Sequence, residues 1–343
     1  MSIAPGQLDD AHGLAVDSVA DDSSSVDGAV AVRGRSPWEI FRSRLRRDKV
    51  SMVALVFSVL FLVIAAASPL LTRLGVLKPD DQHPDLVTGI GSMPTGFAGG
   101  ITGEHPLGVE PGTGRDLLSR IVTGMTTSLT VAVLATVMAI VLGTVLGLVA
   151  GFAGGSLDWG VSRFLDLVLS FPTTLMLLSL GPVLRQRIAG FTGLPEADPK
   201  VAIIFMVLVL GFFGIPFFAR IIRGQVLSLR EREFVEAARS LGASRARIYV
   251  KELLPHLWAP ILVYTTLVMP QNIAAEAALG FLGVGINPPT ASLGAILNDS
   301  IAYALPDPAY FFFPGLTVFV LVLAFNLLGD GLRDALDPRA GRA

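Results

Sequence analysis

Residues 121–157 read IVTGMTTSLTVAVLATVMAIVLGTVLGLVAGFAGGSL, and this stretch of the chain contains no charged residue. A helix needs about 20 consecutive apolar residues to cross a bilayer, so the stretch predicts a transmembrane helix that is longer than one crossing requires. The whole 343-residue chain shares this character, since 52% of its residues are hydrophobic and 16% are charged. An ordinary soluble domain has roughly 25% charged residues. We therefore predict an all-α membrane protein.

The other apolar runs bring the prediction to six transmembrane helices. The first is expected at residues 50–72, and the other five lie in a core at residues 121–332. The six apolar runs cover approximately residues 50–71, 124–150, 164–184, 201–221, 255–279 and 311–331. A further charge-free run, residues 277–298, is rich in Gly and Pro, which suits an interrupted or re-entrant segment better than a full crossing.

Lys and Arg are distributed unequally between the loops, and the cytoplasmic loops of membrane proteins carry the excess. If the N-terminus lies in the cytoplasm, the inside segments carry 19 basic residues and the outside loops carry seven. The sequence therefore predicts that both termini are cytoplasmic. It also predicts an external loop at residues 73–120 and a cytoplasmic C-terminal tail at residues 333–343.

Two polar segments precede the first span. Residues 1–32 contain six Asp, no Lys or Arg and little apolar periodicity, which predicts a disordered acidic tail. Residues 33–49 carry seven basic residues, interleaved with apolar ones, which is typical of a helix lying on the cytoplasmic membrane surface. A nucleic-acid patch is the alternative, but the adjacent span favours membrane lipid as the partner of this basic segment, with no nucleic acid.

The residues that the chain lacks exclude several kinds of chemistry. It has no Cys and its four His are scattered, so we expect no metal site. None of its four Lys is followed by Ser or Thr, as a phosphate-binding loop requires. Nucleophilic and acid–base groups do not cluster either, so we expect no catalytic residue and no bound cofactor. Any ATP chemistry has to come from a partner chain.

The stretch between the fourth and fifth spans, residues 228–255, carries the most informative pattern. Ser228 and Glu231 fit a capping box, which predicts a helix from there to Leu241. Gly242 fits the left-handed residue that follows a helix, and Ser244 can cap a second short helix. The first helix is either a solvated loop element or a helix that docks a partner. Its apolar side includes Phe234, Ala237, Ala238 and Leu241.

The same stretch resembles the EAA loop of bacterial ABC importer permeases. The matching residues are Glu236, Ala237, Ala238, Gly242, Leu254 and Pro255. Glu252 departs from the pattern, since that position is commonly apolar or His in the family. Further matching motifs lie, in order, at residues 105–108, 114–120, 281–290 and 326–334. Residues 36–339 thus resemble the C-type permease subunit of dipeptide, oligopeptide and nickel importers, a binding-protein-dependent transport system inner membrane component. The acidic tail and residues 185–199 depart from it.

This resemblance implies a type I ABC importer permease architecture, in which a cytoplasmic EAA coupling helix sits in a cleft of an ATP-hydrolysing subunit. Glu236, Ala237, Ala238 and Gly242 would be the coupling residues. The implied partners are a homologous second permease subunit, two ABC ATPase subunits that bind ATP and Mg²⁺, and an extracytoplasmic solute-binding protein. The chain would form half of a translocation path for di- or oligopeptides, or a related solute, in a bacterial plasma membrane.

The second span carries glycines spaced four residues apart, which form one smooth stripe on a helix and permit close packing of another helix. The stripe consists of Gly143, Gly147, Gly151 and Gly155. It packs either against another helix of the same subunit or against the second permease subunit.

Glu276 is the one carboxylate inside a span-like apolar stretch, and a charge at mid-bilayer costs about 2.5–3.5 kcal/mol. Three interpretations follow. Glu276 and Asn272 belong to the translocation path or its gate; or Glu276 forms a structural hydrogen bond, for example with Asn272 or Gln271; or it lies close to the membrane surface.

Two other functions are compatible with a multi-span chain. A stand-alone secondary transporter or channel predicts intramembrane charge relays and inverted repeats, whereas this sequence shows one such acidic residue and no evident repeat. A membrane enzyme requires clustered reactive groups, and none is visible. The sequence therefore favours the importer permease.

Overall fold

The computed structural model describes residues 37–89 and 91–336, and the predicted acidic tail at residues 1–32 lies outside this range. The α-helices are α1 (Pro37–Arg47), α2 (Lys49–Arg73), α3 (Leu117–Ala153), α4 (Gly155–Ser170), α5 (Thr173–Thr192), α6 (Pro199–Leu229), α7 (Glu233–Ser240), α8 (Arg245–Arg247), α9 (Trp258–Phe281), α10 (Leu293–Ser300) and α11 (Pro308–Leu336). Shorter elements are η1 (Pro84–Leu86), η2 (Ile248–Leu253), η3 (Leu254–His256), η4 (Ile301–Tyr303) and the two-residue strands β1 (Val87–Thr88) and β2 (Met93–Pro94).

The expected all-α membrane architecture is confirmed. Within the described residues, α2, α3, α6 and α11 are each long and apolar enough to cross a membrane. Two bent pairs, α4 with α5 and residues 245–256 with α9, pass the same test together, so the number of spans is up to six if each bent pair is one span. Two of these helices are longer than one crossing needs, since α3 begins at Leu117 and α6 continues to Leu229.

The predicted third span, residues 164–184, is not one straight helix. The chain bends by 86° between α4 and α5, at Phe171 and Pro172. A residue before proline is disfavoured in the helical conformation, and Phe171 accordingly adopts an extended one, with φ −83° and ψ 131°. The sequence-based boundaries missed this break because the hydrophobic run continues through it.

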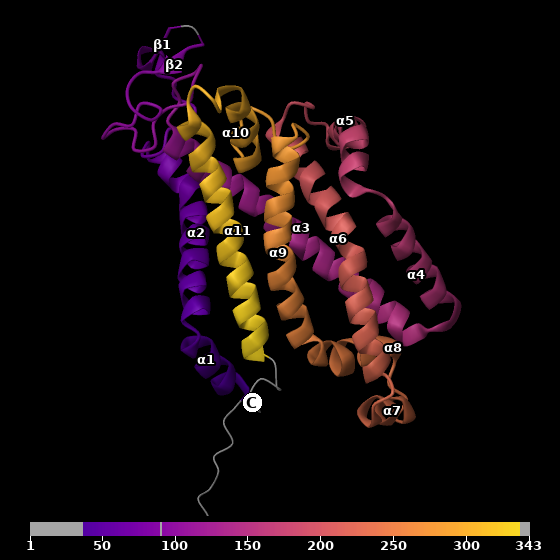
Figure 1. Cartoon of the computed structure of the whole chain (residues 1–343). Helices are drawn as coiled ribbons and strands as arrows, with labels where there is room; N and C mark the ends of the chain where they lie inside the picture. Colours follow the sequence, from indigo (N-terminus) through magenta and orange to yellow (C-terminus); the bar gives the residue numbers. More distant parts are fainter. Residues whose placement is uncertain (1–36, 90, 337–343) are drawn as a thin grey trace, which may run out of the picture.

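The helices form a single row in which α3 passes obliquely behind the others (Figure 1). Its most extensive partner is α6, while α2, α9 and α11 pack against its other end. One apolar cluster joins α3, α9, α10 and α11 through residues such as Leu129, Ile273, Ile296 and Leu321. A second joins α3, α5 and α6 through Val131, Leu177 and Phe205. The core therefore lies along both sides of α3.

The run at residues 277–298 does not cross the bundle, as predicted from its glycines and prolines. The helix α9 ends at Phe281, the chain turns back, and α10 packs against the last turn of α9. The two helices approach so closely that a Cβ added at Gly280 would lie 2.8 Å from the Cα of Gly294. Side chains larger than hydrogen are therefore excluded from this contact.

A cap of loops and the β1–β2 pair covers one end of the bundle, and α7 lies at the other (Figure 1). Buried charges attach this cap to the helices. Glu110 Oε1 accepts a hydrogen bond of 2.9 Å from Arg120 Nε, and Glu110 Oε2 accepts one of 2.6 Å from Arg115 Nε. Arg120 Nη1 also donates to the Pro289 carbonyl at 2.7 Å. Burial, and secondly the charge of Glu110, raises the pKa of Asp299 in the adjacent α10.

Candidate functional site

The segment that joins α6 to α9 differs at its start from the sequence prediction. Ser228 still belongs to the last turn of α6, where its hydroxyl donates to the Gln225 carbonyl. Glu231 accepts from Arg230 Nε, so the expected capping box is not formed. The predicted helix start is wrong because Val226 is fully buried in the core, which keeps α6 helical beyond its apolar run. The next helix, α7, begins at Glu233.

The end of α7 follows the prediction. Gly242 has a φ of +75°, in the left-handed region that glycine adopts without strain. Its N–H donates to the Arg239 carbonyl, and the N–H of Ala243 donates to the Ala238 carbonyl. This pair of bonds is the Schellman motif, which closes a helix and reverses the chain direction. Gly242 therefore sets the angle at which α7 ends.

The return path to the membrane is a chain of short helical turns. Ser244 Oγ accepts from the Arg247 N–H and caps α8, as expected. The chain then passes through η2 and η3, which contains Leu254 and Pro255, and bends by 66° into α9. From residue 245 to residue 256 the elements α8, η2 and η3 follow one another without an intervening loop. Most of the connection from α7 to α9 is therefore helical.

One face of α7 packs on the bundle and the other faces outward. Val235 is fully buried against residues of α6, η2 and η3, and Phe234 stacks on His256 with 4.6 Å between ring centroids. Ala238 is partly buried in the same cluster. Glu236 and Ala237 are exposed, and 88% of the Leu241 surface is accessible. The predicted apolar face is therefore divided between an inner and an outer side.

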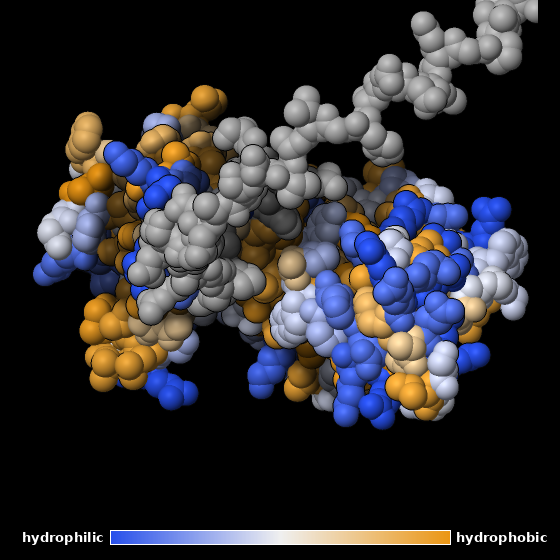
Figure 2. Space-filling view, turned by 90° about the horizontal axis from the view of Figure 1, so that it is seen from below, coloured by the Kyte–Doolittle hydropathy of each residue, from blue (hydrophilic) through white to orange (hydrophobic). Residues whose placement is uncertain are grey.

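A hollow of about 480 Å³ opens beside the outer side of α7. It is lined by Phe234, Ala237, Ala238, Leu241, Gly242, Ala243, Ser244, Arg247 and Glu252. Seen from below, hydrophilic residues surround this end of the molecule and apolar residues are set among them (Figure 2). An exposed apolar patch with a charged rim is typical of a surface that binds another protein.

The predicted glycine stripe lies in the contact between α3 and α6, the helix that leads into this end of the molecule. A Cβ added at Gly143 would lie 2.5 Å from Phe218, and one at Gly147 would lie 2.7 Å from the Ala219 carbonyl oxygen. At Gly151 the added atom would lie 2.9 Å from Val226. These three glycines of α3 therefore let α6 approach within the same subunit, which was one of the two alternatives.

Gly155 does not continue the row, and that prediction is wrong. The helix α3 ends at Ala153, and Gly155 begins α4 with a φ of +59°. A Cβ added there would have no neighbour within 4 Å. Gly154 and Gly155 both have positive φ and form the turn between α3 and α4, so Gly155 shares the four-residue spacing but not the packing role.

Glu276 and Asn272 are both buried in α9. The Asn272 amide donates to Thr136 Oγ1 of α3 at 2.8 Å. An Asn272–Glu276 hydrogen bond, part of one of the three interpretations, is not formed, because neither Glu276 carboxyl oxygen has a partner among the described residues. The hydroxyls of Ser128 and Ser292 lie near the Glu276 carboxyl group, but in the described part of the chain neither carboxyl oxygen forms a hydrogen bond. The two residues of α9 therefore face the interior of the bundle, toward α3 and the start of α10.

Two ion pairs between α4 and α6 were not predicted. Arg223 binds Asp158 through both Nε (2.5 Å) and Nη2 (2.8 Å), and Arg220 Nη2 lies 2.5 Å from Asp166 Oδ1. The sequence could have indicated them, because the acidic residues of α4 and the basic residues of the last turns of α6 flank apolar runs that were both predicted to be spans. The pairs connect the first half of the broken span to the helix that leads into α7.

Comparisons with known proteins identify the family of the chain. Residues 143–342 match the family described as "Binding-protein-dependent transport system inner membrane component". The chain belongs to this family. Residues 36–86 match the "N-terminal TM domain of oligopeptide transport permease C". The two matches together place α1 and α2 in one recognised unit and the region from the glycine row onward in another.

Two named relatives are similar to the chain over most of its length. The glutathione transport system permease protein GsiD of Shigella flexneri serotype 5b (strain 8401) is 35% identical over 305 residues, 89% of this chain and 91% of the relative. The dipeptide transport system permease protein DppC of Alkalihalophilus pseudofirmus is 35% identical over 308 residues, with coverages of 89% and 90%. The chain is thus an ABC importer permease, as its motifs indicated.

A solved structure shows the same fold. The MetNI methionine ABC transporter, in an inward-facing conformation, has a chain that matches with a TM-score of 0.51 and 21% identity. The match covers 64% of this permease and 98% of that chain. The permease therefore has the fold of ABC transporter membrane subunits.

Proposed function

We propose that this permease forms half of the translocation path of an importer for dipeptides, oligopeptides or the tripeptide glutathione. The relatives at 35% identity transport glutathione and dipeptides by name, which supports a short peptide as the substrate class. A second permease subunit would supply the other half of the path. A solute-binding protein would deliver the peptide from outside the cell.

The α6–α9 segment is the proposed coupling element, and the observation that carries this role is the outer face of α7. Ala237 and Leu241 are exposed beside a hollow, on a helix that follows α6 closely and is joined to α9 by consecutive helical turns. Small side chains permit close approach of a partner. The chain has no phosphate-binding loop, so ATP and Mg²⁺ would bind to two partner ATPase subunits, one of which would bind this face of α7.

The proposed orientation places α7 in the cytoplasm of a bacterial cell. The excess of Lys and Arg supports it, since 19 of the basic residues fall on that side. The helix α1 and the C-terminal end of α11 lie at the same end of the bundle as α7 (Figure 1), so both termini would also be cytoplasmic. The cap around β1 and β2 would then face the binding protein.

Ala237→Trp tests the coupling role, because Ala237 is exposed whereas Ala238 packs partly inside the chain. We expect normal insertion but at least about tenfold less ATPase subunit copurifying, since disruption of a hot-spot residue at the centre of an interface costs about 2 kcal/mol or more. Ala302→Trp, an exposed residue at the opposite end, is the matched control.

Two results would overturn the proposal. One is an Ala237→Trp permease that copurifies ATPase subunits and supports ATP hydrolysis at the wild-type level. The other is uptake of a labelled dipeptide by vesicles that contain the purified permease alone. The second result would replace the importer with a stand-alone secondary transporter.

A further inference from the structure

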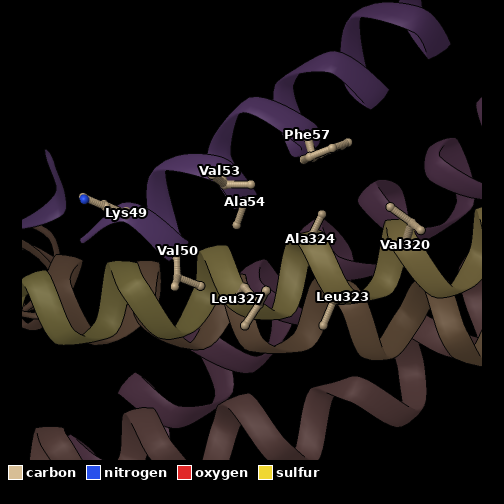
Figure 3. Close-up of a pocket in the computed structure, with 9 residues that line it drawn as sticks. All are labelled: Lys49, Val50, Val53, Ala54, Phe57, Val320, Leu323, Ala324 and Leu327. Carbon is tan, nitrogen blue, oxygen red and sulfur yellow. The ribbon is translucent and has the colours of Figure 1, made fainter. Parts of the chain in front are cut away.

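An apolar groove of about 370 Å³ runs between α2 and α11 (Figure 3). These two helices lie on the side of the helix row opposite to α4 and α5 (Figure 1). The walls of the groove are Val50, Val53, Ala54, Phe57, Val320, Leu323, Ala324 and Leu327, and Lys49 stands at one end. Ala54 and Ala324 extend toward each other across it (Figure 3). Both alanines are buried where the two helices touch, so they form the floor of the groove.

The position of the groove along α2 relates it to one membrane surface. Lys49 is the first residue of α2, and the lining residues up to Phe57 cover only the first two turns, about 12 Å of helix. Half of the hydrocarbon core is about 15 Å thick. The groove therefore has the depth of one leaflet, with its charged end at the headgroup level.

The charged end is positive. Residues 37–49 carry five basic and two acidic residues. In the described part of the chain Lys49 forms no ion pair with the protein, and its side chain is exposed, as are those of Arg46 and Arg47. The neighbouring Asp48 carboxylate stays negative, and it accepts from the Val50 N–H at 3.0 Å and bonds the Ser51 hydroxyl. Basic residues still outnumber acidic ones in this segment, so a negative ligand meets a net positive charge here.

We propose that this groove binds one anionic phospholipid, with an acyl chain against the exposed Val53 and Leu323 and the headgroup phosphate at Lys49 and the exposed Arg46 and Arg47. The apolar walls offer hydrocarbon contacts and no hydrogen-bonding group. A peptide bound there would therefore have unsatisfied backbone N–H and C=O groups. The volume is that of a small-molecule site, and a helix 10–12 Å across does not fit inside it. Only the assignment to the cytoplasmic leaflet rests on the proposed orientation.

Photo-crosslinking tests the site on the full-length permease purified with its bound subunits in lipid nanodiscs. The probes are phosphatidylglycerol and phosphatidylcholine, each with a photoreactive group in the acyl chain, and the products are mapped by mass spectrometry. We expect phosphatidylglycerol to label α2 and α11 around Val53 and Leu323 more strongly than phosphatidylcholine. Lys49→Gln should reduce the ratio about fivefold, as expected for one lysine near an anionic surface.

Matched variants separate charge from shape. Arg73→Gln removes a basic residue from the other end of α2 and should leave the ratio unchanged. Val53→Trp, on the exposed wall of the groove, fills it and should abolish labelling by both probes, whereas Val63→Trp, on an exposed part of the same helix, should not. Equal labelling of the groove by both lipids in the wild type would overturn the proposal.

A protein occupant is the remaining alternative, and it has its own test. The permease contains no Cys, so a single Val53→Cys can be probed with a short bifunctional reagent in the complex. Crosslinking of Val53→Cys to another subunit in high yield would overturn the lipid site and assign the groove to a partner. Both readouts are independent of ATPase binding, so failure here leaves the coupling proposal intact.

Discussion

Gly147 and Gly242 are both required by the fold, and for opposite reasons. Gly147 lies in the α3–α6 contact with negative φ, and an added Cβ would be 2.7 Å from a backbone oxygen. Gly242 has a φ of +75°, and an added Cβ would meet nothing within 4 Å. The first position lacks space, whereas the second has space but a conformation that other residues rarely adopt.

The difference separates stability from function in this permease. The α3–α6 contact is the most extensive between two helices of the described chain, so a change there alters the core. The turn at Gly242 lies on the surface, where a change alters only the direction in which α7 ends. Substitutions at the two sites are therefore expected to fail in different assays.

The largest effect is expected for Gly147→Leu. The new side chain would meet the backbone of α6, which cannot move aside without separating the helices, so we expect destabilisation of more than about 3 kcal/mol. The measurement is the yield and melting temperature of the solubilised permease. Gly224→Leu on α6, where an added Cβ has no neighbour within 4 Å, is the control. Equal melting temperatures would contradict the close-packing role.

A smaller effect on stability, but a complete loss of uptake, is expected for Gly242→Val. A β-branched residue at positive φ costs on the order of 1–3 kcal/mol, which the exposed turn can relieve by changing its path. The permease should insert normally while its ATPase binding falls. Gly242→Asn should restore much of the binding, because Asn tolerates the left-handed conformation. If Val and Asn variants behave alike, the turn conformation is not what coupling needs.

Much of this comparison could be predicted from the sequence. The positive φ of Gly242 follows from a glycine after a short amphipathic run, because helix ends are decided by local hydrogen bonds. The glycine spacing in residues 121–157 indicated a close contact, but not which helix makes it. The start of α7 was missed, since the burial of Val226 extends α6 past Ser228.

The interior partners could not be predicted for a related reason. Asn272 pairs with Thr136, which is 136 residues away in the chain, and only the packing of α9 on α3 brings them together. The bend at Pro172 was visible as a proline, but prolines inside α2, α6 and α11 do not break those helices. Whether a proline ends a helix in a membrane depends on neighbours that the sequence does not name.

The ion pairs between α4 and α6 offer the finest test, because they lie beside the glycine row. Arg223 binds Asp158 in a bidentate geometry with side chains 32% and 18% exposed, whereas Arg220 and Asp166 are about half exposed. The backbone N–H of Arg223 is also a neighbour of Gly147, so this pair joins α4 to the close contact. We expect the more buried pair to be the stronger.

Double-mutant cycles on thermal stability measure both pairs, with Asp158→Asn and Arg223→Gln in one cycle and Asp166→Asn and Arg220→Gln in the other. We expect a coupling energy of about 1 kcal/mol for the first pair and less than about 0.5 kcal/mol for the second, since exposed pairs contribute little. Salt should weaken the second pair more, because solvent ions screen exposed charges first. A coupling energy near zero for the Asp158–Arg223 pair would show that α4 is not fixed to α6 at Asp158. The broken span would then move independently of the helix that leads into α7.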